Sequence, residues 1–200
     1  MSSICNEEYK LYLVAEEGKV THTSLLLLKK DWDVASIKKG NVARVIEFDP
    51  NLTNKNMPVD HKRQLSGVEK VVDPFPQTTF REGYVSDLAR IDTGSYDVCD
   101  NNCRHYLALV VRKVVIDKKA NKKSAEKMLK AFIFAAKRRN EKNYTAGAML
   151  AGAFAVFTGF LAPVLGAGLV LAGVVAGKAI FTSEKSINRI LELKEIKLKR

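Results

Sequence analysis

Short apolar runs separated by polar turns fill the first half of the chain, in the pattern of a small antiparallel sheet. Residues 10–15 and 20–28 are two such runs with Glu-Glu-Gly-Lys between them, which predicts a β-hairpin. Residues 42–48 (VARVIEF) alternate apolar and polar side chains and predict another strand, and residues 68–72 predict one more. Residues 49–95 otherwise hold four of the five prolines, so we expect loops through most of that stretch.

A helix is predicted after these strands. Asp100, Asn101 and Asn102 are good N-capping residues, and they precede an apolar run that extends from residue 107 to residue 116. We therefore expect a helix that begins near Cys103. The valine-rich part of the run is also compatible with a strand.

The longest apolar feature lies near the C-terminus. From residue 145 to residue 177 the chain has 33 residues without an ionisable side chain, well beyond the ~18 apolar residues that indicate a membrane segment. One straight helix of that length would measure ~50 Å against a hydrocarbon core of ~30 Å, and Pro163 stands where two arms of similar length would meet. Basic residues flank both ends, which favours placing both on the cytosolic side. We expect a helical membrane hairpin over residues 145–181, with a single spanning helix or a buried hairpin in a soluble core as alternatives.

Features within and beside this run bear on its partners. Gly173 and Gly177 have the spacing that lets helix backbones approach closely, which favours contact between the two arms or a homo-oligomer of the chain. Residues 124–139 and 183–200 each place apolar side chains on one stripe among lysines, so we expect basic amphipathic helices at an anionic membrane surface. Packing against the soluble domain is the alternative for both. Residues 117–123 (DKKANKK) have the composition of a solvated linker.

The charge balance supports that placement. The net charge of the 200-residue chain is +11, and the excess is C-terminal, because residues 112–144 carry +9 and residues 145–200 carry +4. A basic chain often binds nucleic acid, but here the charge brackets an apolar run, so we expect membrane lipids and no nucleic acid as partners. Three cysteines are too few for a disulfide framework, and the first twenty residues contain no signal-like stretch. These features indicate an intracellular membrane, with the soluble domain facing the cytosol.

Cys103 is the candidate nucleophile. A cysteine in the first turn of a helix lies against unpaired backbone N–H groups and the positive end of the helix dipole, which stabilise the thiolate. A thiol enzyme also needs an imidazole within hydrogen-bond reach. Of the three histidines, His22 lies in a predicted strand that can hold an imidazole rigidly, whereas His61 lies in a polar loop and His105 would point to a different side of the helix from Cys103. We therefore predict His22 as the partner. The spacing of Cys99, Cys103 and His105 fits no common zinc site, so we expect no metal and no cofactor.

These residues resemble a known arrangement. A histidine on an early strand (THTSLLLL), followed some eighty residues later by Asn-Cys-x-His-aromatic at a helix start (NNCRHY), is similar to the circularly permuted papain-like thiol enzymes. The segment Asn102–Tyr106 resembles the Asn-Cys-Glu-His-Phe motif of lecithin:retinol acyltransferase and its NlpC-type phospholipase/acyltransferase relatives. The sequence His-Thr-Ser at His22 resembles instead a strand of the PPPDE-type deSUMOylating peptidases. The resemblance covers roughly residues 9–116.

The resemblance implies an acyl-transfer mechanism. Cys103 would attack an ester or amide carbonyl to give an acyl-enzyme, His22 would act as base and then as acid, and the Cys103 backbone N–H would help to hold the oxyanion. The remaining motif residues would support the motif or the substrate; they are Asn102, His105 and Tyr106.

Two positions depart from the family pattern. The acyltransferase branch has a second histidine about a dozen residues after the first, and this chain has none there. His22 would be oriented by an acidic side chain, and the candidates are Asp31, Asp33 or a side chain on the next strand such as Glu47. We name Asp33 as the candidate. The alternative is a site that works as a Cys-His dyad without a third residue. Arg104 replaces the acidic residue of the family motif, which changes the local charge.

The sequence thus predicts an α+β fold. It combines a papain-like thiol domain (residues 1–116, a small antiparallel sheet with a catalytic helix), a basic linker and amphipathic helix (117–144), a C-terminal helical membrane hairpin (145–181) and a basic tail (182–200). The expected function is that of a membrane-anchored cysteine acyltransferase or phospholipase-type hydrolase acting on a lipid acyl ester. The alternatives are a thiol isopeptidase or thioesterase acting on an acylated or ubiquitin-like-conjugated protein, and a non-enzymatic membrane-remodelling protein.

Overall fold

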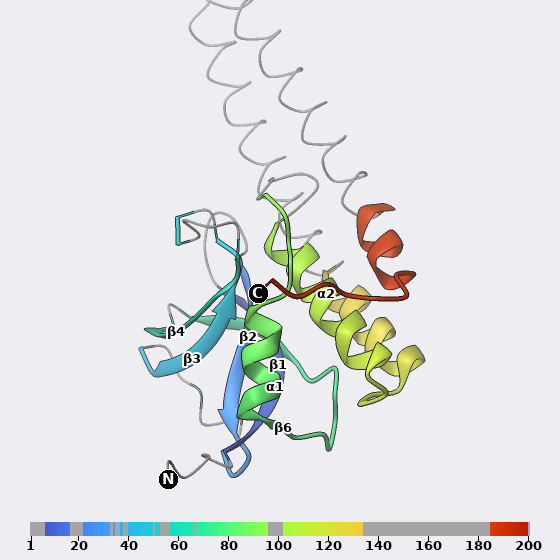
Figure 1. Ribbon diagram of the computed structural model, residues 1–200. Helices are drawn as coiled ribbons and strands as arrows, with labels where there is room; N and C mark the ends of the chain where they lie inside the picture. The colour runs from blue at the N-terminus through green and yellow to red at the C-terminus, as the bar shows by residue number, and fades with distance from the viewer. Residues whose placement is uncertain are drawn as a thin grey trace, which may run out of the picture.

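Helices cover one face of an antiparallel sheet in this protein (Figure 1). The computed structural model describes residues 7–16, 22–32, 34, 37, 40–49, 51–52, 57–65, 67–95, 102–133 and 185–199. The elements are β1 (Glu8–Glu16), β2 (Thr23–Lys29), β3 (Val42–Glu47), β4 (Val59–Gln64), β5 (Val68–Val72), β6 (Phe80–Arg81), α1 (Glu82–Ala89) and α2 (Cys103–Ile116), and residues 122–133 and 185–191 are also helical.

The sheet confirms the strands that the hydrophobic pattern predicts. Its order is β4-β3-β2-β1-β5, and β6 pairs with the start of β1. β1 and β2 form the predicted hairpin, in which Ala15 lies opposite Thr23. Strands β3 and β5 occupy the predicted positions. β1 and β2 lie inside the sheet and are buried on both faces, which explains why their sequences are almost continuously apolar.

β4, like the two-residue β6, is a strand that the sequence pattern does not predict. It occupies part of residues 49–95, where we expected mostly loops, and β6 and α1 lie there too. The sequence of β4 (VDHKRQ) is polar because the strand is at the edge of the sheet, where its side chains are at most half-buried. Charged residues on an edge strand are common because they discourage pairing with other chains. The apolar alternation that marks an internal strand is therefore missing.

The helix α2 is the central element of the core. Nine of its 14 residues are buried, so the helix is covered on more than one side and carries no broad polar face. Its apolar residues pack in one cluster with side chains from β1, β2 and α1. The predicted helix start at Cys103 is confirmed, and the strand alternative for the valine-rich part is wrong.

The described C-terminal residues belong to the same core. Leu129 and Phe132 in helix 122–133, and Ile187 and Leu191 in helix 185–191, are buried in the cluster that contains α2. These apolar faces are used within the domain, so our expectation that they lie on a membrane surface is wrong for the described parts. The core extends past residue 116, and residues 117–121 form a turn between two packed helices.

The tail is also tied to the domain by its backbone. Ile91 and Leu198 form an antiparallel bridge, the Asp92 N–H donates to the Lys197 carbonyl at 2.9 Å, and the Lys199 N–H donates to the Arg90 carbonyl at 2.8 Å. Residues 197–199 therefore lie beside the end of α1.

The predicted fold class needs one correction. We expected a helical membrane hairpin at residues 145–181. Throughout the part of the chain that the structure describes, no helix has both the length and the apolar character to cross a membrane. Within the described residues the fold class is therefore α+β with an antiparallel sheet, and the membrane hairpin has no support there. Residues 145–181 lie outside the described residues, together with Pro163, Gly173 and Gly177, so the oligomer predicted from the two glycines stays a prediction.

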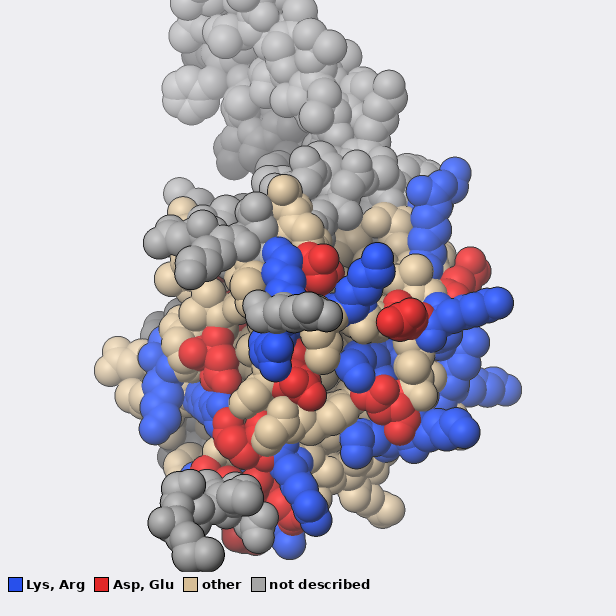
Figure 2. All heavy atoms as spheres, in the orientation of Figure 1, with Lys and Arg blue, Asp and Glu red and all other residues tan. Residues whose placement is uncertain are grey.

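Charge is unevenly distributed over the visible face. Lys and Arg side chains gather over the helical side of the domain, whereas acidic and basic side chains are mixed over the sheet (Figure 2). The predicted anionic partner is compatible with this pattern and stays a prediction.

Candidate active site

The start of α2 holds Cys103 in a fixed position. Asn102 is the N-cap, and its side-chain oxygen accepts a hydrogen bond from the Arg104 N–H at 3.0 Å. His105 Nδ1 accepts from the Asn102 N–H at 3.2 Å, so the two side chains form a reciprocal capping box. Tyr106 is fully buried and donates from its hydroxyl to the Leu88 carbonyl at 3.3 Å. Asn102 and His105 therefore support the helix start, and Tyr106 links α2 to α1.

The Cys103 thiol is buried against the beginning of β2. Its exposed fraction is 6%, and it lies beside the His22 imidazole and the Thr23 backbone N–H. Burial raises the pKa of the thiol, but the His22 hydrogen bond and charge, together with Thr23, outweigh burial and hold the pKa below its ordinary value. The site therefore favours the thiolate.

His22 lies between Cys103 and a carboxylate. Its Nε2 is 2.8 Å from Glu47 Oε2, and its Nδ1 is 3.9 Å from Asp49 Oδ2. Burial lowers the pKa of His22, but hydrogen bonds to Cys103 and Glu47 raise it to about 10. At neutral pH the imidazole is therefore protonated, and the lowered pKa of the neighbouring Cys103 thiol favours the thiolate.

Glu47 is the residue that orients His22. It ends β3, its side chain is 3% exposed, and its two oxygens contact His22 Nε2 at 2.8 Å and His61 Nε2 at 2.7 Å. Burial raises the pKa of Glu47, but hydrogen bonds from His22 and Arg63 outweigh burial and lower it to about 2. Glu47 is therefore a carboxylate at any physiological pH.

Of the alternatives that the sequence left open, the structure brings Glu47 to His22. Asp31 is exposed after the far end of β2, and Asp33 lies outside the described residues. The pattern VARVIEF contained the signal for Glu47, since an acidic residue closing a strand in a buried register needs a partner.

Sequence reasoning missed His61 and Arg63. We expected His61 in a solvated loop, but it lies on β4 and binds Glu47. Arg63, also on β4, donates to both Glu47 and Glu16. Since β4 itself was not predicted, neither residue could be placed near His22 from the sequence.

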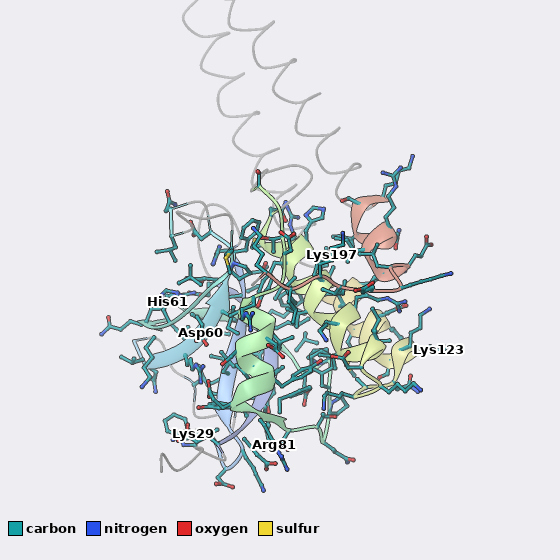
Figure 3. All side chains as sticks on the ribbon, in the orientation of Figure 1. Lys29, Asp60, His61, Arg81, Lys123 and Lys197 are labelled. Carbon is teal, nitrogen blue, oxygen red and sulfur yellow. The ribbon has the colours of Figure 1, made fainter. Side chains whose placement is uncertain are left out.

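Within the described ranges, no three His, Cys, Asp or Glu side chains are arranged to hold a metal ion. Cys5 and Cys99 lie outside those ranges. A pocket of about 580 Å³ is lined by residues at the other end of the sheet, including Lys29 and Val42. Lys29 lies well apart from His61 in Figure 3. Lys29 ends β2 and His22 precedes its start, so the length of this strand, ~20 Å, lies between them. The pocket is not part of the candidate site.

No protein-family model, curated protein or solved structure matches this chain. The resemblance to the permuted papain-like thiol enzymes therefore stays a prediction, and the chemistry of the site rests on its geometry.

Proposed function

We propose that this protein is a cysteine-dependent acyl hydrolase or acyltransferase that works through an acyl-enzyme on Cys103. The observation that carries the proposal is the 2.8 Å contact between Glu47 Oε2 and His22 Nε2 beside the buried Cys103, and the His22 charge there lowers the pKa of the thiol. A thiolate paired with an oriented imidazolium is the arrangement that thiol acyl-transfer chemistry requires.

The first half-reaction forms a thioester. The Cys103 sulfur attacks the carbonyl carbon, a C–S bond forms, and the carbonyl electrons move to the oxygen. The Cys103 N–H stands in the first turn of α2, where a helix offers no backbone acceptor, so it can donate to this oxyanion. His22 gives its proton to the leaving group as the original bond to the carbonyl carbon breaks.

The second half-reaction restores the site. His22, now neutral, takes a proton from water or from an acceptor hydroxyl or amine as that nucleophile attacks the thioester. The C–S bond breaks, the acyl group leaves as an acid, ester or amide, and the thiolate and imidazolium are formed again. Glu47 keeps the imidazole in one orientation through both steps.

The substrate class rests on the resemblance alone. Asn102–Tyr106 resembles the acyltransferase motif, which favours a lipid acyl ester, whereas a peptide or protein amide is the outcome that the His-Thr-Ser resemblance would give.

The direct test is intact-mass spectrometry of the full-length protein after mixing with an activated fatty-acyl ester. We expect one acyl group on Cys103 at early times, its loss on longer incubation, and no such adduct in Cys103→Ala. His22→Ala should slow the appearance of the adduct at neutral pH. An adduct that forms equally on Cys5 and Cys103 would refute the proposal, as would no adduct from a fatty-acyl, a peptidyl or a ubiquitin-like thiol-reactive probe.

A further inference from the structure

Two buried carboxylates share one guanidinium behind the candidate site. Arg63 donates from Nη2 to Glu47 Oε2 at 3.0 Å and from Nε to Glu47 Oε1 at 3.2 Å. It also donates from Nη1 to Glu16 Oε2 at 2.9 Å and from Nη2 to Glu16 Oε1. Glu16 is 5% exposed and Glu47 3%, so both carboxylates are almost fully removed from water.

The placement of these residues on the sheet explains why Arg63 is needed. Arg63 lies on the edge strand β4, Glu47 ends β3, and Glu16 ends β1. Because β2 separates β3 from β1, the guanidinium reaches across the end of the sheet to join the two carboxylates. Two like charges buried this close together repel each other, and without a cation one of them takes up a proton or moves.

We propose that Arg63 is a positioning residue of the candidate site, which holds the ionised Glu47 carboxylate in the orientation that lets it accept from His22. This inference rests on the proposed function, since it assigns Arg63 a role in preparing the Cys103–His22 pair. Arg63 does not touch the reacting atoms and acts through Glu47. The charged and titratable groups around Glu47 are His22 and Cys103 on one side, His61 and Arg63 from β4, Glu16 from β1 and Asp49 after β3.

The expected consequence of losing Arg63 has a definite sign. In Arg63→Met, Glu47 and Glu16 lose their common cation, so Glu47 is protonated more readily or turns away from His22. His22 then holds its proton less firmly, and the Cys103 thiolate loses part of its stabilisation. The pH at which Cys103 becomes reactive should therefore rise by about one unit, which is a tenfold slower reaction below that midpoint.

The chain offers a matched control on the opposite face of the sheet, because Arg44 and Asp60 alternate along β3 and β4 with the positions that carry His61 and Arg63. Arg44 also bridges two carboxylates, Asp60 at 2.6 Å and Glu82 at 2.7 Å, and its side chain is 20% exposed against 22% for Arg63. Arg44→Met removes the same kind of bridge without touching Glu47. It should lower the free energy of unfolding by a comparable amount and leave the reactivity of Cys103 unchanged.

The experiment measures, as a function of pH, the rate at which iodoacetamide alkylates Cys103 in the full-length protein. Peptide mass spectrometry detects the modified cysteine. We expect the midpoint to move up in Arg63→Met, to move up less in Arg63→Lys, which keeps the charge but loses the fork geometry, and to stay in place in Arg44→Met. Equal midpoints in wild type and Arg63→Met would overturn the proposal and leave Arg63 a structural residue. If Arg63→Met does not fold, Arg63→Lys decides the question in the same way.

The assay needs no substrate, so it separates two kinds of failure. A wild-type Cys103 that reacts with the pH dependence of an ordinary thiol would refute the proposed function itself. A lowered wild-type midpoint that Arg63→Met does not change would refute only the role of Arg63.

Discussion

Glu47→Gln is the substitution that isolates the charge behind His22. Glutamine has nearly the same shape as glutamate, so the packing at the end of β3 stays close to that of the wild type. The substitution removes the negative charge that His22 contacts at 2.8 Å and His61 at 2.7 Å, and it presents an amide to Arg63. Any change at His22 therefore reports the carboxylate charge.

The size of the effect follows from the contacts. A hydrogen bond to a charged group contributes about 1.5–3 kcal/mol, which corresponds to about one to two pKa units. We therefore expect the pKa of His22 to fall from about 10 by about one to two units, while the pKa of the Cys103 thiol rises. Removing one partner of a buried charge cluster should also cost about 3–5 kcal/mol of unfolding free energy.

The assay is a nuclear magnetic resonance titration of the His22 ring, with urea unfolding alongside it. Glu82→Gln is the matched control, because it removes one carboxylate from Arg44 and lies away from His22. An unchanged His22 midpoint in Glu47→Gln would refute the reasoning, since the carboxylate would then contribute nothing to the imidazolium. A shift of the same size in Glu82→Gln would also refute it, because the effect would not come from the contact.

Three further expectations concern stability. Glu47 has a folded pKa of about 2 against an ordinary value of 4.5, so ionised Glu47 contributes about 3 kcal/mol to the free energy of unfolding above pH 4.5. This contribution is lost as the pH falls toward 2. Urea unfolding measured at several pH values should show the loss, and Glu47→Gln should flatten the slope. Asn102→Ala removes the N-cap of α2 and should cost about 0.5–2 kcal/mol in urea unfolding, whereas Asn102→Asp should retain most of the cap. Phe132→Ala should cost about 3–5 kcal/mol, and a cost below about 1 kcal/mol would show that helix 122–133 does not pack in the core.

Local patterns predicted the elements whose burial is regular. The β1–β2 hairpin and β3 follow from apolar runs and alternation, and the start of α2 follows from its capping residues. β4 could not be found in this way, because an edge strand needs no apolar face. Nor could the pattern decide between two surfaces for an amphipathic helix, so we expected helices 122–133 and 185–191 on a membrane, although their apolar residues lie in the same core cluster as α2.

The site shows the same limit. Cys103 and His22 could be paired in sequence because Cys103 lies at the start of a predicted helix and His22 lies within a predicted strand; in the structure His22 directly precedes β2. Their third partner is set by how neighbouring strands end, which is a property of the sheet register. Glu47 lies opposite Val59 in the β3–β4 ladder, so His61 and Arg63 extend from the same face of β4 toward it. Because β4 was not predicted, the contact of His61 and Arg63 with Glu47 could not be predicted either.

The central claim is that Cys103 is a thiolate because His22 is protonated beside it. The most direct measurement is a pH titration of Cys103 in wild type and in His22→Ala, in which the ultraviolet absorbance of the thiolate reports the ionised fraction. We predict a wild-type midpoint well below the ordinary thiol value of about 8.5, and a midpoint at or above that value in His22→Ala, because burial alone raises the pKa of the thiol. Equal midpoints in the two proteins would contradict the account.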